Sequence, residues 1–341
     1  MKIVEVLLRP AIGGAETLVE QLSAHWRRAG HTVNTVYVDP SDRAGGRLSR
    51  VANLARAFRE ADPDVVHAHS ALPNCYARLA SRGRWPVVTV LHSAVRDFDD
   101  ATLRTAERAL PRWTSHVIAV SPGQVQEYRD AIGDRVPVSL VPNGVRAGIV
   151  CRTAPAPRLS RLVAISRLVP QKRIDVLFAG WRGAGLDAEL RIAGMASDGA
   201  TQRQVEAWAA EAAGARLLGR VDDVPTLLAR SDLLVHAADS EAHGGLVPIE
   251  AACAGIPVVV SAAVAADLPR DLAAVTFPTG DADGLAAALR EAADNYPALA
   301  RAAIKRAPAL AEEFSLAACA ERHLDVLRRS VSARSRDGVS A

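Results

Sequence analysis

The residues best suited to chemistry in this chain are cations, carboxylates and glycines that directly follow short apolar runs. Arg167 and Lys172 lie in the segment RLVPQKR, which follows the apolar run Arg161–Ser166. Two cations beside a helix N-terminus act on the same anion and suit a diphosphate group. Of the 41 basic residues only three are lysine, so the presence of Lys172 favours a specific role over a solvated surface loop.

A second segment of this kind runs from Asp239 to Ser261, with the sequence DSEAHGGLVPIEAACAGIPVVVS. An apolar run ends there in an acidic, glycine-rich turn, and Pro248 fits the first turn of a following helix. Glu241 and Glu250 flank the glycines, so their carboxylates can bind sugar hydroxyls while glycine amides hold phosphate oxygens. A glycine turn followed by a helix-dipole glutamate explains Glu250 alone, but not the whole arrangement.

Three further segments carry weaker signals. Paired glycines in RPAIGGAE, residues 9–16, let the backbone approach a ligand, although a plain strand-to-helix turn explains the segment equally well. His92 ends the apolar run of TVLHSA, where it is either a core histidine or a functional one. His67 and His69 alternate in VVHAHS and share a face of their strand, so they are structural or acceptor-side residues. A metal pair at these two histidines lacks a third ligand in the sequence.

Other potential metal ligands have simpler explanations. Three DxD triplets could hold a divalent metal together with phosphates, but each also suits a turn or a helix start. The four cysteines are far apart and form no CxxC pair, which favours reduced thiols. We therefore predict no metal site. The triplets are Asp62-Pro-Asp64, Asp97-Phe-Asp99 and Asp281-Ala-Asp283.

These segments need a framework that brings strand ends side by side, and the rest of the sequence predicts one. Apolar runs rich in valine and isoleucine alternate with helical patterns, which is typical of β-α units around a parallel sheet. In such sheets ligands bind outside the carboxyl ends of the strands. The expected strands are 3–8, 32–38, 65–68, 87–91, 117–120 and 139–141, then 161–166, 189–193, 215–218, 233–237, 257–261 and 274–277.

The length of 341 residues suits two domains of about 150 residues each. After PNGV the periodic pattern lapses into RAGIVCRTAPAPRLS, which indicates a linker at 145–158. We expect a first domain at 1–144 and a second at 159–312. A helix should follow at 313–330, with a flexible polar tail at 331–341.

Composition and charge exclude several classes of protein. Fractions of 49% hydrophobic and 23% charged residues exclude a disordered or fibrous chain. The net charge of +3 is too weak and too evenly spread for nucleic-acid binding. The sequence contains neither a signal-peptide pattern nor an apolar run long enough to span a bilayer. We expect a cytoplasmic protein whose basic tail permits weak contact with the inner face of a membrane.

In their order along the chain, these segments resemble family 4 of the retaining glycosyltransferases, which have the GT-B fold. The matching motifs are GGAE, H-x-H, T-x-x-H, AVSP, PNGV, the R-x4-K loop, GRVDDVPTLLARSDLLVHAADSE and the acidic glycine turn. They extend over about residues 1 to 330. The resemblance implies an α/β protein of two Rossmann-like domains, with parallel sheets facing an interdomain cleft and a final helix that crosses back to the first domain.

The resemblance also implies a division of labour, with a nucleotide diphosphate sugar held by the second domain and an acceptor by the first. Arg167 and Lys172 would neutralise the diphosphate, while Glu241 would contact sugar hydroxyls. Glu250 would bind the ribose, and His92 would bond the transferred sugar or align the acceptor. The implied catalytic residues are His92, Arg167, Lys172 and Glu241. The implied donor-binding residues are Gly13, Gly14, Arg167, Lys172, Glu241, Gly244, Gly245, Leu246, Val247 and Glu250, and the acceptor-side residues are Glu16, His69 and His92.

One motif departs from the family pattern, because eight residues separate Glu241 from Glu250 where the family usually has seven. We expect a metal-independent retaining transfer of a hexose from a UDP-sugar, or next a GDP-sugar, with no cofactor besides this co-substrate. The acceptor hydroxyl would belong to a carbohydrate, a lipid-linked sugar or a small metabolite. A nucleotide-sugar epimerase and a non-catalytic sugar-nucleotide binding protein are the alternatives. A Rossmann dehydrogenase is disfavoured, because its glycine fingerprint is missing.

Overall fold

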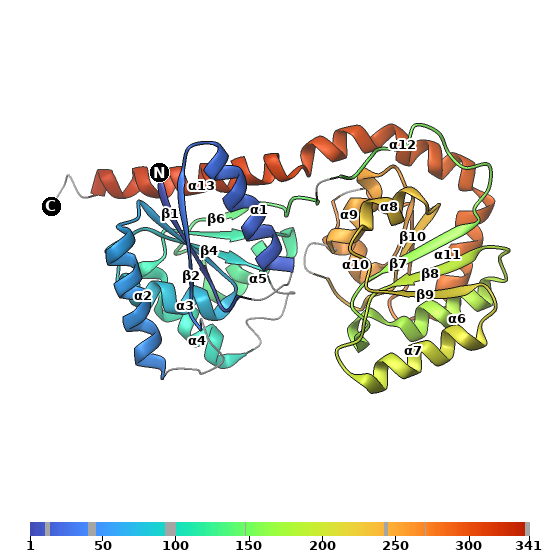
Figure 1. Ribbon diagram of the computed structural model, residues 1–341, viewed down its shortest axis with the longest axis horizontal. Coiled ribbons are helices and arrows are strands. Elements are labelled where there is room, and N and C mark those ends of the chain that lie inside the picture. Colours follow the sequence, from blue (N-terminus) through green and yellow to red (C-terminus); the bar gives the residue numbers. More distant parts are fainter. Residues whose placement is uncertain are drawn as a thin grey trace. The chain divides into compact units, whose positions relative to one another are not determined.

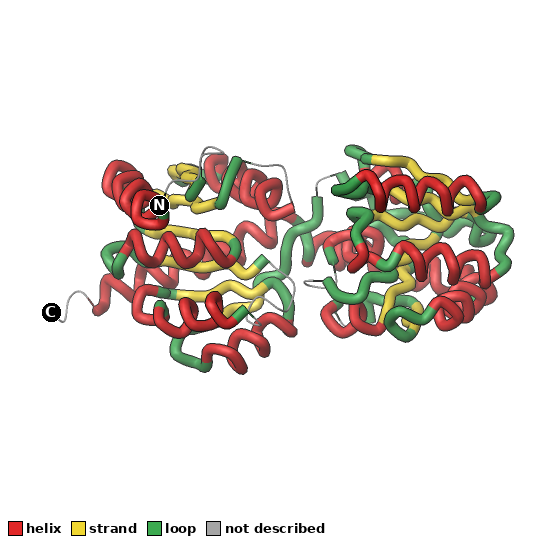
Figure 2. The backbone as a smooth tube through the Cα atoms, turned by 90° about the horizontal axis from the view of Figure 1, so that it is seen from below, coloured by secondary structure: helices red, strands yellow, loops and turns green. Residues whose placement is uncertain are grey.

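The computed structural model describes residues 1–10, 14–39, 46–92, 100–146, 148–241, 245–269 and 271–337. The chain forms two compact units. Unit 1 comprises Met1–Gly144 and Leu316–Ala341, and unit 2 comprises Val145–Ser315. In each unit, helices cover a parallel sheet of six strands (Figures 1 and 2). The structure confirms the predicted α/β architecture with two parallel sheets.

The sheet of unit 1 has the strand order β2-β1-β3-β4-β5-β6, so the order reverses between β1 and β3. Its strands are β1 (Lys2–Leu7), β2 (Thr32–Tyr37), β3 (Val65–His69), β4 (Val87–Leu91), β5 (His116–Ala119) and β6 (Val138–Leu140). Its helices are α1 (Gly14–Arg28), α2 (Arg47–Ala61), α3 (Ala71–Ser81), α4 (Ala101–Ala109), α5 (Pro122–Ile132) and α13 (Leu316–Asp337), with a 3₁₀ turn at Pro111–Trp113.

The sheet of unit 2 has the order β12-β11-β10-β7-β8-β9, so the reversal lies between β7 and β10. Its strands are β7 (Arg161–Ile165), β8 (Glu189–Ala193), β9 (Ala215–Gly219), β10 (Leu233–His236), β11 (Val258–Ser261) and β12 (Val275–Phe277). Its helices are α6 (Ile174–Ala184), α7 (Gly199–Glu211), α8 (Val224–Ala229), α9 (Leu246–Cys253), α10 (Ala262–Asp267), α11 (Ala282–Asp294) and α12 (Tyr296–Glu313). Ligands of doubly wound sheets bind at such reversals.

The central strands are continuous apolar runs because helices cover both of their faces. Every residue of β3 (VVHAH), β4 (VVTVL) and β11 (VVVS) is buried. Val and Ile suit these positions because their branched side chains pack well on a pleated surface. All twelve expected strands are present, and no strand end differs from the prediction by more than one residue.

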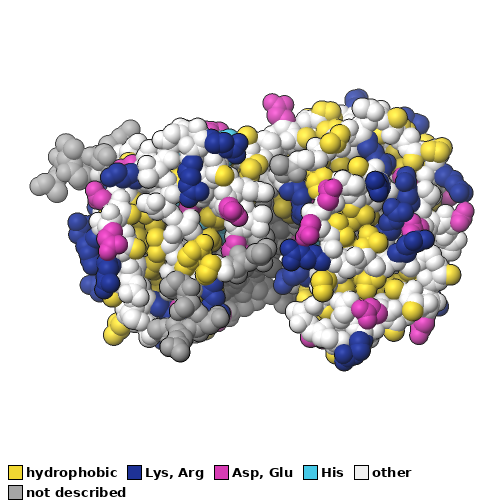
Figure 3. All heavy atoms as spheres, in the orientation of Figure 1, with side chains coloured by type: hydrophobic (Ala, Val, Ile, Leu, Met, Phe, Trp, Pro, Cys, Tyr) yellow, Lys and Arg dark blue, Asp and Glu magenta, His cyan; other side chains and the backbone are white. Residues whose placement is uncertain are grey.

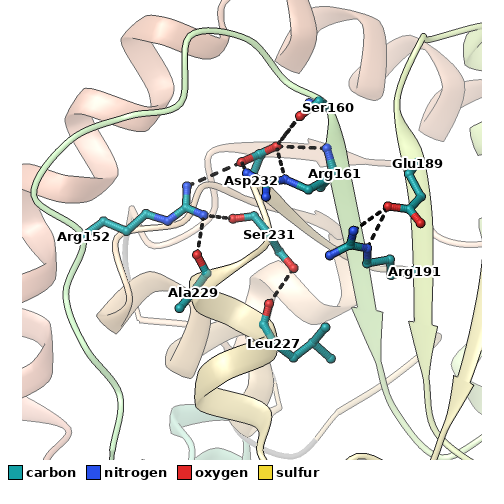
Figure 4. Close-up of polar contacts among 9 residues, drawn as sticks. All are labelled: Arg152, Ser160, Arg161, Glu189, Arg191, Leu227, Ala229, Ser231 and Asp232. Atoms are coloured by element: carbon teal, nitrogen blue, oxygen red, sulfur yellow. Dashed lines mark hydrogen bonds and ion pairs between the residues drawn. The ribbon is translucent and has the colours of Figure 1, made fainter.

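In unit 2, Asp232 ties the amino end of β10 to that of β7 (Figure 4). Its buried carboxylate accepts hydrogen bonds from the Ser160 hydroxyl at 2.9 Å and from the Arg161 guanidinium at 3.0 Å. The Arg152 guanidinium lies 3.6 Å from the same carboxylate. Burial raises the pKa of Asp232, but the hydrogen bonds from Arg161 and Ser160 outweigh it and lower this pKa. Since the two strands are fixed at one end, their opposite ends lie at defined positions.

The C-terminal helix α13 is longer than the sequence predicts, so the expectation of a flexible tail at 331–341 is wrong for residues 331–337. Val331 packs against the core of unit 1, and the hydroxyl of Ser330 donates to the carbonyl of Val326 at 2.9 Å. Serine can therefore continue this helix by bonding to the preceding turn. In unit 1, α13 packs beside α1, where the Trp26 indole donates to the Ala320 carbonyl at 3.0 Å (Figure 1).

The segment 145–158 lies wholly in unit 2 and contains neither helix nor strand in its described residues. Its backbone is tied to this unit, because the amide of Arg152 donates to the Ala254 carbonyl at 3.0 Å. On the face drawn in Figure 3, basic side chains are spread over both units among acidic and apolar ones. Among the helices of the described ranges, none combines the length and apolar character needed to cross a membrane.

Candidate functional site

The candidate site of unit 2 lies where the loops that follow β7 and β10 meet. These loops leave the carboxyl ends of the two strands between which the strand order reverses. The amide of Asp239 donates to the Gln171 carbonyl at 2.9 Å, and the side-chain amide of Gln171 donates to the Ser240 carbonyl at 2.8 Å. These bonds hold the two loops together, so residues far apart in sequence can act on one ligand.

Lys172 and Glu241 form an ion pair at this junction. The 3₁₀ turn Pro170–Lys172 places the Lys172 ammonium against Oε1 of Glu241, and the lysine is only 9% exposed. His236, the last residue of β10, places its Nε2 at 2.8 Å from the same oxygen. Burial raises the pKa of Glu241, but His236 and then Lys172 outweigh it and lower this pKa to about 2. Glu241 is therefore a carboxylate at neutral pH.

Gly245 lets the chain pass close to Glu241 before α9 begins. Its φ of +83° lies in the left-handed region, and an added Cβ would lie 3.4 Å from Cγ and Cδ of Glu241 and from Cδ of Pro248. Leu246 and Val247 follow in the first turn of α9. The first amides of a helix have no partner within the helix, so they can bind an anion. The structure thus brings Gly245 together with Glu241.

Glu250 is fully buried one turn further along α9. Its Oε1 accepts a hydrogen bond from Nε of Arg146 at 2.5 Å, whereas its Oε2 has no partner among the described residues. Burial raises the pKa of Glu250, and Arg146 opposes this effect only in part. A buried acceptor without a partner costs about 1–3 kcal/mol, so this oxygen is suited to accept a hydrogen bond from a ligand hydroxyl.

The other cations of this loop differ in their surroundings. Arg167 is exposed, and the described residues provide it with no ion pair. Arg173 pairs with Asp175 at 2.9 Å and with Asp239 at 3.2 Å. The structure therefore brings Lys172 into direct contact with Glu241, whereas Arg167 forms no hydrogen bond or ion pair with either residue in the described part of the chain.

In unit 1, the predicted acceptor-side histidines belong to a buried cluster. Glu5 on β1, His67 and His69 on β3, His92 after β4 and His323 on α13 lie in a row. Nδ1 of His69 lies 2.9 Å from Nε2 of His92, and Nε2 of His69 lies 2.6 Å from Oε2 of Glu5. The structure thus brings His69 and His92 together, and Glu5 holds His69 from the other side.

Charge in this cluster is set by burial and by the neighbours of each group. Burial raises the pKa of Glu5, but the charges and hydrogen bonds of His67 and His69 outweigh it and lower this pKa to about 2. Burial lowers the pKa of His69, an effect that Glu5 opposes. Burial also lowers the pKa of His92 well below its ordinary value. At neutral pH we therefore assign a carboxylate to Glu5 and neutral rings to His69 and His92.

Glu5 supplies the third potential metal ligand that the sequence did not reveal. Ligand atoms of Glu5, His67 and His69 all lie within 4.8 Å of one another. The histidine nitrogens, however, lie 2.6–3.1 Å from the carboxylate oxygens, which is hydrogen-bond distance. The geometry therefore fits a hydrogen-bonded cluster in which the carboxylate already binds both rings.

Three residues of these sites, and one residue of α13 that packs against His67, were not predicted from the sequence. Glu5 and His236 are polar residues of buried strands. His236 is the last residue of β10, and His92 directly follows the last residue of β4. Arg146 directly follows the PNGV motif, and His323 lies on the apolar face of α13. A polar residue at a position otherwise reserved for apolar ones was the available signal in three of these cases.

The remaining predicted residues are less informative. Gly14 begins α1, and Glu16 lies half-buried in its first turn. The described contacts include none between Glu16 and either His69 or His92. Gly13 and Gly244 lie outside the described residues.

Known proteins resemble this chain in domain family and in fold. The family model of Glycosyltransferase Family 4 matches residues 12–148, and that of Glycosyl transferases group 1 matches residues 160–295. No curated protein matches the chain in sequence. Solved structures match over nearly the whole chain at 15–20% identity, which shows a shared fold.

One similar structure is HepE of Anabaena in complex with UDP and glucose, with a TM-score of 0.81, 19% identity, and coverage of 96% of this chain and 100% of that one. Another is the sucrose-phosphate synthase of Thermosynechococcus elongatus, with a TM-score of 0.80, 20% identity, and coverage of 97% and 99%. A third is the catalytic domain of starch synthase IV from Arabidopsis thaliana bound to ADP and acarbose, with a TM-score of 0.68, 15% identity, and coverage of 97% and 99%.

The two family models together account for most of both units. The first covers unit 1 from α1 to β6, and the second covers the sheet of unit 2 together with Lys172, Glu241 and Glu250. The chain therefore belongs to the GT-B glycosyltransferases, with a family 4 domain followed by a group 1 domain.

Proposed function

We propose that the protein transfers a hexose from a nucleotide diphosphate sugar, a UDP-sugar first and a GDP-sugar next, to an acceptor hydroxyl. The transfer retains the anomeric configuration and uses no metal ion. The observation that carries this proposal is the ion pair of Lys172 and Glu241 where the strand order of unit 2 reverses, beside Gly245 and the first turn of α9. HepE, which shares this fold, binds UDP and UDP-glucose.

Each part of a nucleotide diphosphate sugar has a matching group in unit 2. The ammonium of Lys172 and the first amides of α9 suit the diphosphate, because a cation and a helix N-terminus both stabilise anions. When the diphosphate replaces Glu241 as the partner of Lys172, the carboxylate of Glu241 becomes available to accept hydrogen bonds from the hydroxyls of the sugar. Oε2 of Glu250 lacks a partner among the described residues and suits a ribose hydroxyl.

The chemistry follows from charge stabilisation of the leaving group. The bond between the anomeric carbon and the diphosphate oxygen breaks first, as Lys172 and Arg167 stabilise the departing negative charge. The acceptor hydroxyl then bonds to the anomeric carbon on the same face, and its proton passes to a phosphate oxygen of the leaving diphosphate. No protein nucleophile is needed, so catalysis depends on interactions that strengthen as the negative charge develops.

The acceptor is a hydroxyl of a carbohydrate, a lipid-linked sugar or a small metabolite. The family 4 domain in unit 1 supports an acceptor held there, near His69 and His92. The neutral rings of these residues suit hydrogen bonds to hydroxyl groups rather than to anions.

The test begins with donor binding to the whole protein. Calorimetric titration with UDP, GDP, UDP-glucose and GDP-mannose, each with EDTA or with Mg²⁺, measures base preference and metal dependence. We expect UDP compounds to bind more tightly than GDP compounds, and EDTA to leave their affinity unchanged. Incubation of UDP-glucose with a panel of sugar acceptors, followed by proton NMR, then gives the anomeric configuration of the product.

Three results contradict the proposal in different ways. An inverted product configuration disproves the retaining mechanism, while an epimerised donor without added acceptor indicates an epimerase. Binding of UDP-sugars with no turnover across the acceptor panel would indicate a sugar-nucleotide binding protein.

A further inference from the structure

The buried cluster of unit 1 has a fixed direction of hydrogen bonding, which begins at Glu5. Its side chain is fully buried on β1, and its pKa of about 2 makes it a carboxylate at neutral pH. A carboxylate can only accept hydrogen bonds. Every histidine nitrogen within hydrogen-bond distance of Glu5 must therefore carry a hydrogen.

His69 transmits this direction away from Glu5. Its Nε2 lies 2.6 Å from Oε2 of Glu5 and so carries the hydrogen of that bond. Because burial lowers the pKa of His69, the ring is neutral and its other nitrogen, Nδ1, has a free lone pair. Nδ1 of His69 is therefore a hydrogen-bond acceptor, and it lies 2.9 Å from Nε2 of His92.

His92 comes next in the chain of bonds. Its Nε2 must carry a hydrogen, because the atom that it faces on His69 can only accept. Its ring is partly exposed and nearly parallel to that of His69, with an interplanar angle of 23° and centroids 5.2 Å apart. Since the contacts of His92 within the described residues use Nε2, its Nδ1 is the nitrogen left for a ligand.

We propose that Glu5 and His69 are positioning residues that fix the tautomer of His92, so that His92 offers the lone pair of Nδ1 to a substrate hydroxyl. His92 then recognises a hydrogen-bond donor, which identifies its ligand as a sugar or acceptor hydroxyl rather than a phosphate or carboxylate oxygen. The ligand assignment rests on the proposed function, whereas the tautomer does not.

The second branch of the cluster leads away from His92. Nδ1 of His67 lies 3.1 Å from both oxygens of Glu5, and Nε2 of His67 lies 3.3 Å from Nδ1 of His323. The tautomer of His92 does not depend on this branch, because the bonds of His69 to Glu5 through Nε2 and to His92 through Nδ1 involve neither His67 nor His323. His323 is as deeply buried as Glu5, so it provides a matched control for packing.

The direct test is the tautomer of His92 in the wild-type protein. The chain has nine histidines, and two-dimensional proton–nitrogen NMR of protein labelled with ¹⁵N-histidine distinguishes protonated from bare ring nitrogens in each. The spectrum of His92→Gln identifies the His92 signals by their loss. We expect a protonated Nε2 and a bare Nδ1 at pH 7.5. A protonated Nδ1 at this pH overturns the proposal, and no variant of the buried carboxylate needs to fold for this result.

The functional test compares Glu5→Gln with His323→Gln. A glutamine amide can donate to Nε2 of His69, which lets both rings turn to the opposite tautomer and gives His92 a hydrogen on Nδ1. We expect Glu5→Gln to lower kcat about 100-fold, as for loss of a correctly protonated acid–base group, and to show the altered His92 signal. His323→Gln should stay within about twofold of wild-type kcat, since it disturbs the same packing outside this branch. Glu5→Asp keeps the carboxylate and should restore part of the activity.

Three outcomes separate the explanations. Equal losses of kcat in Glu5→Gln and His323→Gln, at matched thermal stability, would mean that the cluster serves packing alone. Stoichiometric zinc in the purified wild-type protein that is absent from Glu5→Gln would also overturn the proposal, because a metal would then occupy the nitrogens assigned to hydrogen bonds. Failure of UDP-glucose to bind in calorimetry refutes the proposed function, but leaves the NMR result on His92 intact.

Discussion

The two units place polar residues at the same topological position, where strand order reverses, but stabilise them by opposite means. In unit 1, Glu5 and the histidines form a buried row of hydrogen bonds that, among the described residues, leaves Nδ1 of His92 without a partner at its partly exposed end. In unit 2, Lys172 and Glu241 form an ion pair that retains some access to solvent, with exposed fractions of 9% and 16% for the two side chains. A bound anion can replace one partner of an ion pair, whereas the row of hydrogen bonds has a fixed direction. We therefore expect unit 2 to bind an anion that replaces Glu241 as the partner of Lys172. We expect unit 1 to bind a hydroxyl that donates a hydrogen bond to the lone pair on Nδ1 of His92.

Removal of the positive charge of Lys172 should have the largest effect on activity. Lys172→Ala should lower kcat about 100- to 1,000-fold, because the leaving diphosphate loses a cation that acts mainly as negative charge develops. The unfolding temperature should change little, since Glu241 keeps its hydrogen bond to His236. Lys305→Ala is the matched control, as Lys305 is an exposed lysine of α12 in the same unit. Near-normal turnover by Lys172→Ala would contradict the role assigned to unit 2.

Glu250→Gln should weaken donor binding about 10- to 100-fold, as expected from the loss of a hydrogen bond to a charged acceptor. Burial raises the pKa of Glu250, so the folded protein binds the proton of this carboxyl more tightly than the unfolded chain does. The fold is therefore destabilised as the pH rises above the ordinary carboxyl pKa and Glu250 loses this proton. At pH 7 the ligand-free variant should therefore unfold at the wild-type temperature or above it. Calorimetry with UDP and thermal unfolding measure the two effects. Glu211→Gln, an exposed change in α7, controls for the loss of charge. A variant that loses stability but binds UDP normally would assign Glu250 to folding alone.

Gly245→Ala and Gly30→Ala form a matched pair across the two units. Both glycines have a left-handed φ, +83° and +85°, so each alanine should destabilise its unit by about 1 kcal/mol. An added Cβ at Gly30 meets no atom within 4 Å, whereas at Gly245 it meets Glu241 and Pro248 at 3.4 Å. We therefore expect only Gly245→Ala to raise the KM for the donor, by about tenfold. Equal KM values in the two variants would place Gly245 outside the donor site.

The smallest effect concerns the pH dependence of stability. The pKa of Glu241 is lowered to about 2 in the folded protein, so its ion pair stabilises the fold above the ordinary carboxyl pKa, and this contribution is lost as the pH falls toward 2. With allowance for the partial exposure of the pair, we expect a loss on the order of 1 kcal/mol. Urea unfolding from pH 6 to pH 2.5 should show a shallower loss for Glu241→Gln than for the wild type. Parallel curves would mean that the ion pair contributes nothing to stability.

Local patterns in the sequence predicted the strands and some of the residues in each of the two candidate sites. Runs such as VVHAH and VVTVL are apolar because the fold covers both faces of the sheet, so they are legible without tertiary information. Lys172 and Glu241 could be found because both directly follow such runs, and ligand-binding loops follow strands in this class of fold. Their contact confirms that the two loops meet.

The missed residues owe their role to contacts between distant segments. Glu5 looks like an ordinary charge in KIVEVL until β1 pairs with β3, which brings His67 and His69 beside it. His323 lies on the helix face that predicts packing, but the sequence does not reveal which strand that face meets.

The two units differ in when their parts leave the ribosome. Unit 2 is one continuous stretch of chain that precedes α13, so it can complete its core before α13 is made. Unit 1 needs α13, which follows unit 2 in the chain, to cover Trp26 and His67. A nascent chain should therefore finish unit 2, the half proposed to bind the donor, first, and termination before α13 should disable the half proposed to bind the acceptor while leaving the other half folded.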